Sequence, residues 1–199
     1  MAFFKSFFIC LFTLSIFGCK QTKESSIDTA ETTNGTELVV PENLKWSERM
    51  MLSEIERVPK ASMLDFVKKP RWSYTNGLVL SACAKVYEET NKKKYYDYIY
   101  AYADELIDST GTIETYKLSN QNLDMIKSGD VLLYLYPKTK EERFLKAMQT
   151  LHSQMESQPK TSDGGYWHKK IYPHQMWLDG LYMACILYTA DAADDSLRV

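Results

Sequence analysis

Apolar residues recur at helical spacing from residue 46 almost to the end of the chain. The segments with this period are 46–58, 77–89, 94–108, 124–136, 141–156 and 175–188, and none of them shows sustained strand alternation. Turn-forming stretches such as TNKKK, YPKTK and QPKTSDGG separate them. Thr139 and Glu142 match a capping box, which predicts that a helix opens at Thr139. The pattern predicts an all-α fold.

The helical segments repeat with a period of about fifty residues. The motifs NGLVL, SGDVL and DGLYM place Gly77, Gly129 and Gly180 at equivalent positions, and Thr90 aligns with Thr139. Each unit is then a helical hairpin, with an apolar inner helix opening on the glycine turn and a charged outer helix starting at the threonine. Such hairpins build an α-solenoid or a closed α/α toroid, and the long unit favours the toroid.

Aromatic and acidic residues gather where the inner helices begin. Trp72 and Tyr74 precede the first repeat glycine, and Asp124 precedes the second. Trp177 and Asp179 precede the third. If the helices ring an axis, these entrances meet at one mouth of the ring. Two carboxyl groups in one pocket suit an acid–base pair, because a carboxyl beside a second negative charge holds its proton more easily.

The neighbouring side chains indicate an acidic sugar as ligand. Aromatic rings stack on the C–H faces of sugars, and His168 and Lys169 supply donors for a substrate carboxylate. Simpler interpretations stay open, since an Asp near a helix start is often an N-cap and an aromatic residue there is often part of the core. His168 and His174 with Asp163 match no established ligand spacing, so we predict no metal site.

Charge and cysteine content narrow the function classes. The chain has 24 Lys and Arg against 26 Asp and Glu, a balance that argues against nucleic acid as a partner. Cys83 and Cys185 lie within apolar helical patterns. We predict that both are buried thiols, with a disulfide as the alternative.

The N-terminal residues predict export. Residues 1–18 hold Lys5 and then an apolar run too short for a comfortable membrane span, which is typical of a signal peptide. The run ends in SIFGC, which resembles a bacterial lipobox, so we expect cleavage after Gly18 and lipidation of Cys19. A plain secretory signal is the alternative. Residues 19–43 are polar and predict a flexible tether. The expected product is lipid-anchored to a bacterial membrane, in the periplasm or at the cell surface.

Three motifs together resemble one family. WSYTNG, NLDMIKSGD and GGYWHKKIYPHQMWLDGLYM resemble the unsaturated rhamnogalacturonyl hydrolases of glycoside hydrolase family 105, close relatives of the unsaturated glucuronyl hydrolases of family 88. The resemblance spans about the N-terminal half of a family member and implies an (α/α)6 toroid. Residues 44–187 would form a truncated toroid of about three hairpins, and residues 188–199 are expected to be an atypical C-terminal end.

The resemblance also implies a reaction. The substrate would be an oligosaccharide with a terminal unsaturated uronic acid, whose C4=C5 bond is protonated and then hydrated at C5. Asp179 in WLDG matches the general acid and base, and Asp124 in NLD matches a second carboxylate. The substrate-binding positions that it implies are Tyr74, His168, Lys169 and Trp177. It implies neither a metal nor an organic cofactor.

Other functions remain open at this point. A lipid-anchored glycan-binding protein would use the aromatic pocket without turnover. An unsaturated glucuronyl hydrolase would act on products of other polysaccharide lyases. A sugar epimerase on the same fold would rely on paired His rather than on Asp124 and Asp179.

Overall fold

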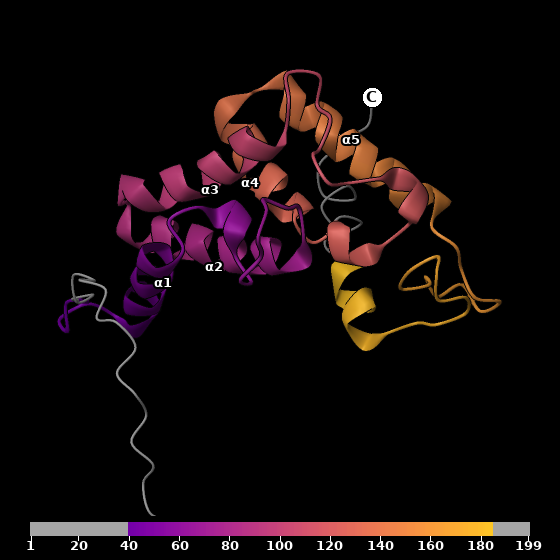
Figure 1. The fold of residues 1–199 in the computed structure, drawn as a ribbon, viewed down its shortest axis with the longest axis horizontal. Helices are drawn as coiled ribbons and strands as arrows, with labels where there is room; N and C mark the ends of the chain where they lie inside the picture. The colour runs from indigo at the N-terminus through magenta and orange to yellow at the C-terminus, as the bar shows by residue number, and fades with distance from the viewer. Residues whose placement is uncertain (1–39, 185–199) are drawn as a thin grey trace, which may run out of the picture. The chain divides into compact units, whose positions relative to one another are not determined.

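A computed structural model describes residues 40–184. These residues form α-helices and 3-10 helices without a strand, which confirms the predicted all-α class (Figure 1). The helices are α1 (Trp46–Arg57), η1 (Ala61–Met63), α2 (Tyr74–Thr90), α3 (Lys93–Leu106), η2 (Leu118–Asn120), η3 (Leu123–Met125), α4 (Gly129–Thr139) and α5 (Glu142–Ser157). The chain is helical again over 178–184. The predicted signal, most of the tether, Cys19, Cys185 and the C-terminal end lie outside the described residues.

The predicted hairpins are present as α2–α3 and α4–α5, each an antiparallel pair packed side by side. Asn91 and Lys140 end the first helix of each pair in the left-handed conformation, with φ of 52° and 56°. The backbone N–H of Asn91 donates to Tyr87 O and that of Lys140 to Tyr136 O, which is a common way to close a helix. The two turns are therefore structural repeats of each other.

The capping box predicted at Thr139 is wrong. Thr139 is the last residue of α4, and α5 begins only at Glu142, after Glu141 as its N-cap. The Thr139 hydroxyl accepts the backbone N–H of Glu141 across the turn, at 3.3 Å. Thr90 likewise ends α2 rather than starting α3. The repeat is present, but its threonine marks the end of the inner helix, because the left-handed residue that follows already reverses the chain.

The outer helices bury one face and the inner helices are apolar on more than one. The buried positions of α3 follow a helical period: Tyr95, Tyr98, Ile99, Tyr102, Ala103 and Leu106. Those of α5 are Phe144, Ala147, Met148, Leu151, Gln154 and Met155. The inner helices, α2 and the helix over 178–184, have buried apolar residues and also exposed ones. The exposed apolar residues include Leu78, Leu181 and Tyr182. A closed toroid would turn such inner-helix side chains toward its axis.

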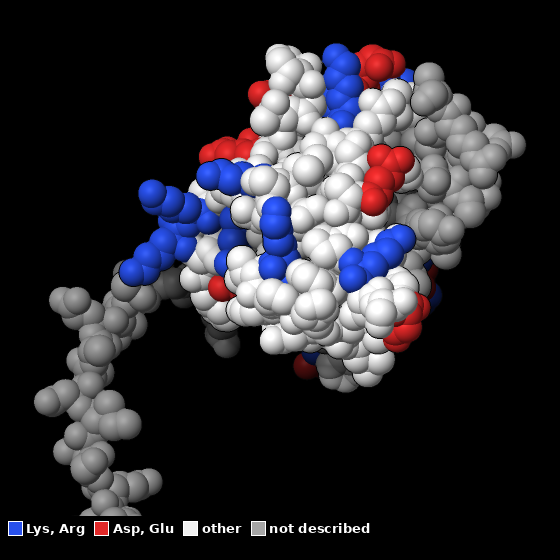
Figure 2. All heavy atoms as spheres, turned by 90° about the vertical axis from the view of Figure 1, so that its right-hand side faces the viewer, with Lys and Arg blue, Asp and Glu red and all other residues white. Residues whose placement is uncertain are grey.

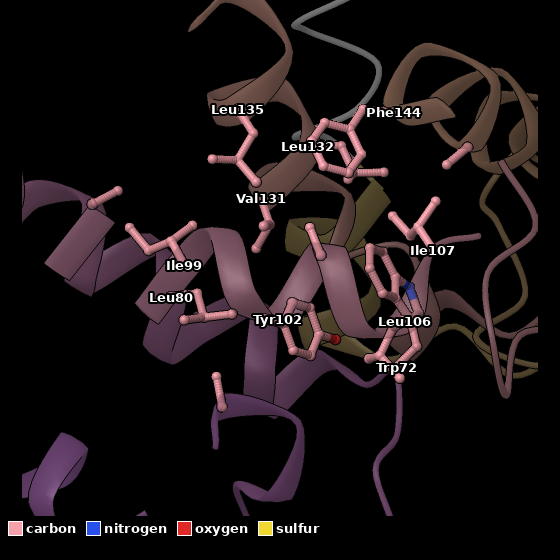
Figure 3. Packing of buried hydrophobic residues seen from close by; sticks show 14 of the residues in the cluster. Trp72, Leu80, Ile99, Tyr102, Leu106, Ile107, Val131, Leu132, Leu135 and Phe144 are labelled. Atoms are coloured by element: carbon pink, nitrogen blue, oxygen red, sulfur yellow. The ribbon is translucent and has the colours of Figure 1, made fainter. Parts of the chain in front are cut away.

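Trp72 belongs to the core, contrary to the prediction that it lies at the mouth. Its ring is fully buried and stacks on Tyr102 at 5.4 Å between centroids (Figure 3). Its indole N–H donates to Met125 O at 2.7 Å. Because Met125 ends η3, this bond fastens the entrance of α2 to the segment that carries Asp124.

The first repeat glycine has a packing role between the same two entrances. A Cβ at Gly77 would lie 2.6 Å from Lys127 O, so only glycine lets α2 approach this backbone. Ser128 Oγ donates to Ser73 O at 2.5 Å and lies 3.1 Å from the Tyr102 hydroxyl. The entrances of α2 and α4 are thus joined through buried contacts.

Cys83 is a fully buried free thiol, as predicted, with Sγ 3.6 Å from Tyr95 O. Within residues 40–184, no helix has the length and apolar character required to cross a bilayer.

Candidate active site

Two loop segments pair at the centre of the site. The backbone N–H of Leu123 donates to His168 O at 3.0 Å, and that of Lys170 donates to Gln121 O at 3.1 Å. Asn122 and Lys169 form an antiparallel bridge between these bonds. This pairing places the NLD motif, which ends at Asp124, beside His168 and Lys169. Residues of the second and third repeat units therefore meet by backbone hydrogen bonding.

Asp124 lies against two nitrogen-bearing side chains, Lys169 and His168. Its Oδ2 lies 2.5 Å from Lys169 Nζ, and its Oδ1 lies 3.0 Å from His168 Nε2. The N-cap of η3 is Asn122, whose side chain accepts the backbone N–H of Asp124 at 3.0 Å. Because Asn122 takes the capping role, the carboxylate of Asp124 is left to bind side chains. It is mostly buried, with 17% of its side chain exposed.

His168 is buried between the two carboxylates. Only 1% of its side chain is exposed, and its ring stacks on Trp177 at 4.2 Å between centroids and 11° between planes. Its Nδ1 lies 3.8 Å from Asp179 Oδ1. Among the described residues neither ring nitrogen has an aligned hydrogen-bond partner, so the ring approaches both carboxylates as an electrostatic neighbour.

Asp179 is the accessible carboxylate. It lies in the first turn of the helix over 178–184, and 56% of its side chain is exposed. Its Oδ1 accepts the backbone N–H of Gly180 at 2.8 Å, so part of the carboxylate serves the helix start. A Cβ at Gly180 would lie 2.8 Å from His168 Nδ1. The third repeat glycine thus lets this helix contact the imidazole.

Comparisons with known proteins show the family of the chain. Residues 46–192 match the model of Glycosyl Hydrolase Family 88. The chain belongs to glycosyl hydrolase family 88. Among solved structures, it is similar to a glycoside hydrolase from family 105 of C. acetobutylicum ATCC 824, at 39% identity and a TM-score of 0.66. The match covers 75% of this chain and 39% of that chain, so this chain spans about two-fifths of the length of that protein.

The family membership confirms the resemblance seen in the motifs and the array of helical hairpins. Five of the predicted site residues of this family 88 chain lie together: Asp124, His168, Lys169, Trp177 and Asp179. Tyr74 is the first residue of α2 and is 42% exposed, and it has no hydrogen bond or ring contact with this cluster among the described residues. The roles of all six remain predictions.

Aromatic and cationic groups line the exposed side of the cluster. The ring of Tyr172 stacks on Trp177 at 5.7 Å, and Lys169 Nζ lies 5.7 Å from the Trp177 ring centroid. Within residues 40–184, no three His, Cys, Asp or Glu side chains are grouped so as to hold a metal ion. His174 contacts the ring of Trp167 at 4.6 Å between centroids.

A buried glutamine supports the site and escaped the sequence analysis. Gln158 Nε2 donates to Gln121 O at 2.9 Å and to Trp167 O at 2.7 Å. Its Oε1 accepts from Gln154 Nε2 at 3.1 Å, and Gln154 Oε1 accepts the Tyr116 hydroxyl at 2.8 Å. Burial raises the pKa of Tyr116, so the hydroxyl stays a donor. The one available signal was the spacing of Gln154 and Gln158, four residues apart at the end of α5.

The charges on one face of the family 88 chain are unevenly spread. Figure 2 shows the side where the chain after α5 lies: Lys and Arg are most numerous at the left edge, and uncharged residues separate the remaining charged side chains. Among the described residues, this face has no continuous basic stripe of the kind that is typical of nucleic-acid binding.

Proposed function

We propose that this protein is a glycosidase that releases the terminal unsaturated uronic acid from rhamnogalacturonan oligosaccharides made by pectin lyases. The observation that carries the proposal is a pair of carboxylates on either side of His168, one accessible and one in an ion pair with Lys169. Membership of family 88 supports a glycosidase, and the likeness to a family 105 enzyme supports the choice of an unsaturated substrate.

The accessible Asp179 would act as the general acid. When protonated, it donates its proton to C4 of the C4=C5 bond, and the electron-poor C5 then takes up the oxygen of a water molecule. The water returns its second proton to the Asp179 carboxylate. The C5 hemiketal that results opens the ring, which leaves a hemiacetal at C1, and this releases the remaining oligosaccharide. The spacing rule for retaining and inverting glycosidases does not apply, because C1 is not attacked.

The buried Asp124 would have a different role from that of Asp179. Its two oxygens already face Lys169 and His168, so it is held in place to orient water or a sugar hydroxyl. The ammonium of Lys169 lies beside the Trp177 ring, where it would attract the uronate carboxylate while the indole covers the sugar ring.

The test follows the absorbance of the C4=C5 bond conjugated with the carboxylate. Protein expressed from its gene is given unsaturated rhamnogalacturonan disaccharide, alongside the Asp179→Asn and Asp124→Asn variants. The matched control is Asp163→Asn, since Asp163 is an exposed loop residue. We expect the absorbance to decay with wild type and the control, and to fall at least ~100-fold more slowly with Asp179→Asn.

Other outcomes would replace the proposal. Substrate that binds without losing its absorbance would support a glycan-binding protein instead. Decay only with unsaturated glucuronyl substrates would support the second hydrolase class.

We further propose that the protein is exported and lipid-anchored through Cys19, with SIFGC as the supporting motif. Cells fed an alkyne fatty acid should label wild type and not Cys19→Ser. Equal labelling of both would contradict the anchor.

A further inference from the structure

We infer that His168 is a positioning residue that sets the separation of Asp124 and Asp179, and that it does not itself contact the substrate. The inference deepens the proposed function, because it names how the two carboxylates of that reaction are held. It differs from the role that the family resemblance implies for this histidine, which is substrate binding.

Burial argues against a direct contact between His168 and a sugar. Only 1% of the side chain is exposed, and Trp177 covers one face of the ring at 4.2 Å. A sugar that reached this imidazole would first have to displace the indole. Contact with the substrate is therefore left to Trp177 and Lys169, which are both more exposed than His168.

The imidazole occupies the space between the carboxylates. Nε2 lies 3.0 Å from Asp124 Oδ1, and Nδ1 lies 3.8 Å from Asp179 Oδ1, so opposite edges of one ring face the two acids. Lys169 Nζ lies 2.5 Å from Asp124 Oδ2, so an ammonium also faces this carboxylate. A ring with two nitrogens can meet two carboxylates at once, and it is attracted to both when it carries a proton.

The backbone fixes the ring from both sides. The N–H of His168 donates to Gln175 O at 2.7 Å, and its carbonyl accepts the N–H of Leu123 at 3.0 Å. Gly180 then decides how close the helix that carries Asp179 comes, because any Cβ there would lie 2.8 Å from Nδ1. The glycine of the third repeat is therefore required by the imidazole, and the imidazole sets the place of Asp179.

A kinetic test separates positioning from packing. His168→Phe keeps an aromatic ring to stack on Trp177 but removes both nitrogens. Positioning predicts that kcat falls about 100-fold, as expected when a catalytic group shifts by about 1 Å, while KM changes less than about threefold. His168→Gln should restore part of kcat, since its amide can contact one carboxylate. Trp177→Ala should instead raise KM. Wild-type kcat in His168→Phe would overturn the inference, because packing alone would then suffice.

A second measurement needs no turnover. The ring ¹⁵N resonances of His168, assigned by their loss in His168→Gln, are recorded in Asp124→Asn, Asp179→Asn and the control Asp163→Asn. If the imidazole lies between the two carboxylates, each of the first two substitutions should change the ¹⁵N shifts of the His168 ring. The control should leave these shifts unchanged. Unchanged shifts in Asp179→Asn would overturn the inference. If wild type fails to consume the substrate while the His168 ring shifts still respond to both substitutions, that result would contradict the proposed function but support the placement of His168 between the two carboxylates.

Discussion

Gln158 donates an amide hydrogen to the carbonyl oxygen of Gln121 over 2.9 Å, and the same nitrogen reaches Trp167 O over 2.7 Å. Gln121 and Trp167 lie on the two segments that pair at the site. One buried amide at the end of α5 therefore fastens both segments. The geometry of the acidic cluster depends on a side chain that contacts none of its members.

Replacing this glutamine should disturb stability and activity together. Gln158→Leu keeps a similar volume but leaves Trp167 O without its donor and removes one of the two donors to Gln121 O, which costs ~1–3 kcal/mol in free energy of unfolding. Guanidinium unfolding measures the loss, and kcat/KM on the unsaturated disaccharide should fall with it. The control is Gln149→Leu on the exposed side of α5. Equal effects of the two substitutions would contradict the role of Gln158.

The indole N–H of Trp72 gives a second test of how the entrances are joined. Trp72→Phe retains a ring beside Tyr102 but removes the donor to Met125 O and leaves a gap. We expect a destabilisation of ~2–4 kcal/mol in thermal or chemical unfolding. Trp46→Phe, at an exposed position of α1, should change stability by less than ~0.5 kcal/mol. Similar losses in both would exclude a joining role for the indole.

Glu48 makes stability depend on acid pH. Its carboxylate is buried in α1, where the ammonium of Lys92 donates to it and the Tyr95 hydroxyl donates at 3.0 Å. The Lys92 bond, helped by Tyr95, holds the pKa of Glu48 below its ordinary value of 4.5 against the opposing effect of burial. The unfolded chain therefore binds this proton more readily. The contribution is fully present above about pH 4.5 and is lost as pH falls through the folded pKa.

Glu48→Gln should thus lower the free energy of unfolding at pH 7 by ~1–3 kcal/mol. The difference from wild type should shrink as the pH is lowered below about 4.5, in urea titrations at several pH values. Glu89→Gln removes an exposed pair with Lys45 and should have an effect near zero. A difference in free energy of unfolding between wild type and Glu48→Gln that stays constant with pH would contradict the ionic role of Glu48.

Cys83 should be chemically silent in the folded protein. Burial raises the pKa of its thiol to about 12, so roughly one molecule in ten thousand carries the thiolate at pH 8. Iodoacetamide should leave the Cys83 peptide unmodified in native protein and label it after unfolding in guanidinium, as read by peptide mass spectrometry. Native labelling as fast as that of the unfolded chain would show that the thiol is reached by solvent.

Helical periodicity was enough to predict the α-helices, because the apolar residues on the buried face of an amphipathic helix recur at a regular spacing in the sequence. The outer helices show this most clearly, with the buried face of α5 recurring from Phe144 to Met155. The threonine of the repeat was misplaced because a capping box and a helix-closing threonine look alike in sequence. Only the left-handed φ of Asn91 and Lys140 separates the two, and neither residue is glycine, the usual signal.

The candidate site was predicted unevenly for a related reason. His168, Lys169, Trp177 and Asp179 share one stretch of sequence, so their proximity is partly local. Asp124 joined them through the repeat, which placed its helix entrance next to theirs. Trp72 shares that position in the first unit but turns into the core, since its N–H finds Met125 O there. The hydrogen-bond partners of the buried Gln158 are set by tertiary contacts, and sequence spacing does not predict them.

The bond between Leu123 and His168 closes a loop of chain that contains the whole α4–α5 hairpin. Long-range contacts of this kind form late in folding, because the entropy lost on closing the loop is compensated only once the intervening helices have packed. The imidazole and Asp124 should therefore meet among the last events. In a nascent or partly unfolded chain, Asp124 and Asp179 would lie apart and could not act on one substrate. Assembly of the acidic cluster would therefore indicate that the second hairpin has formed.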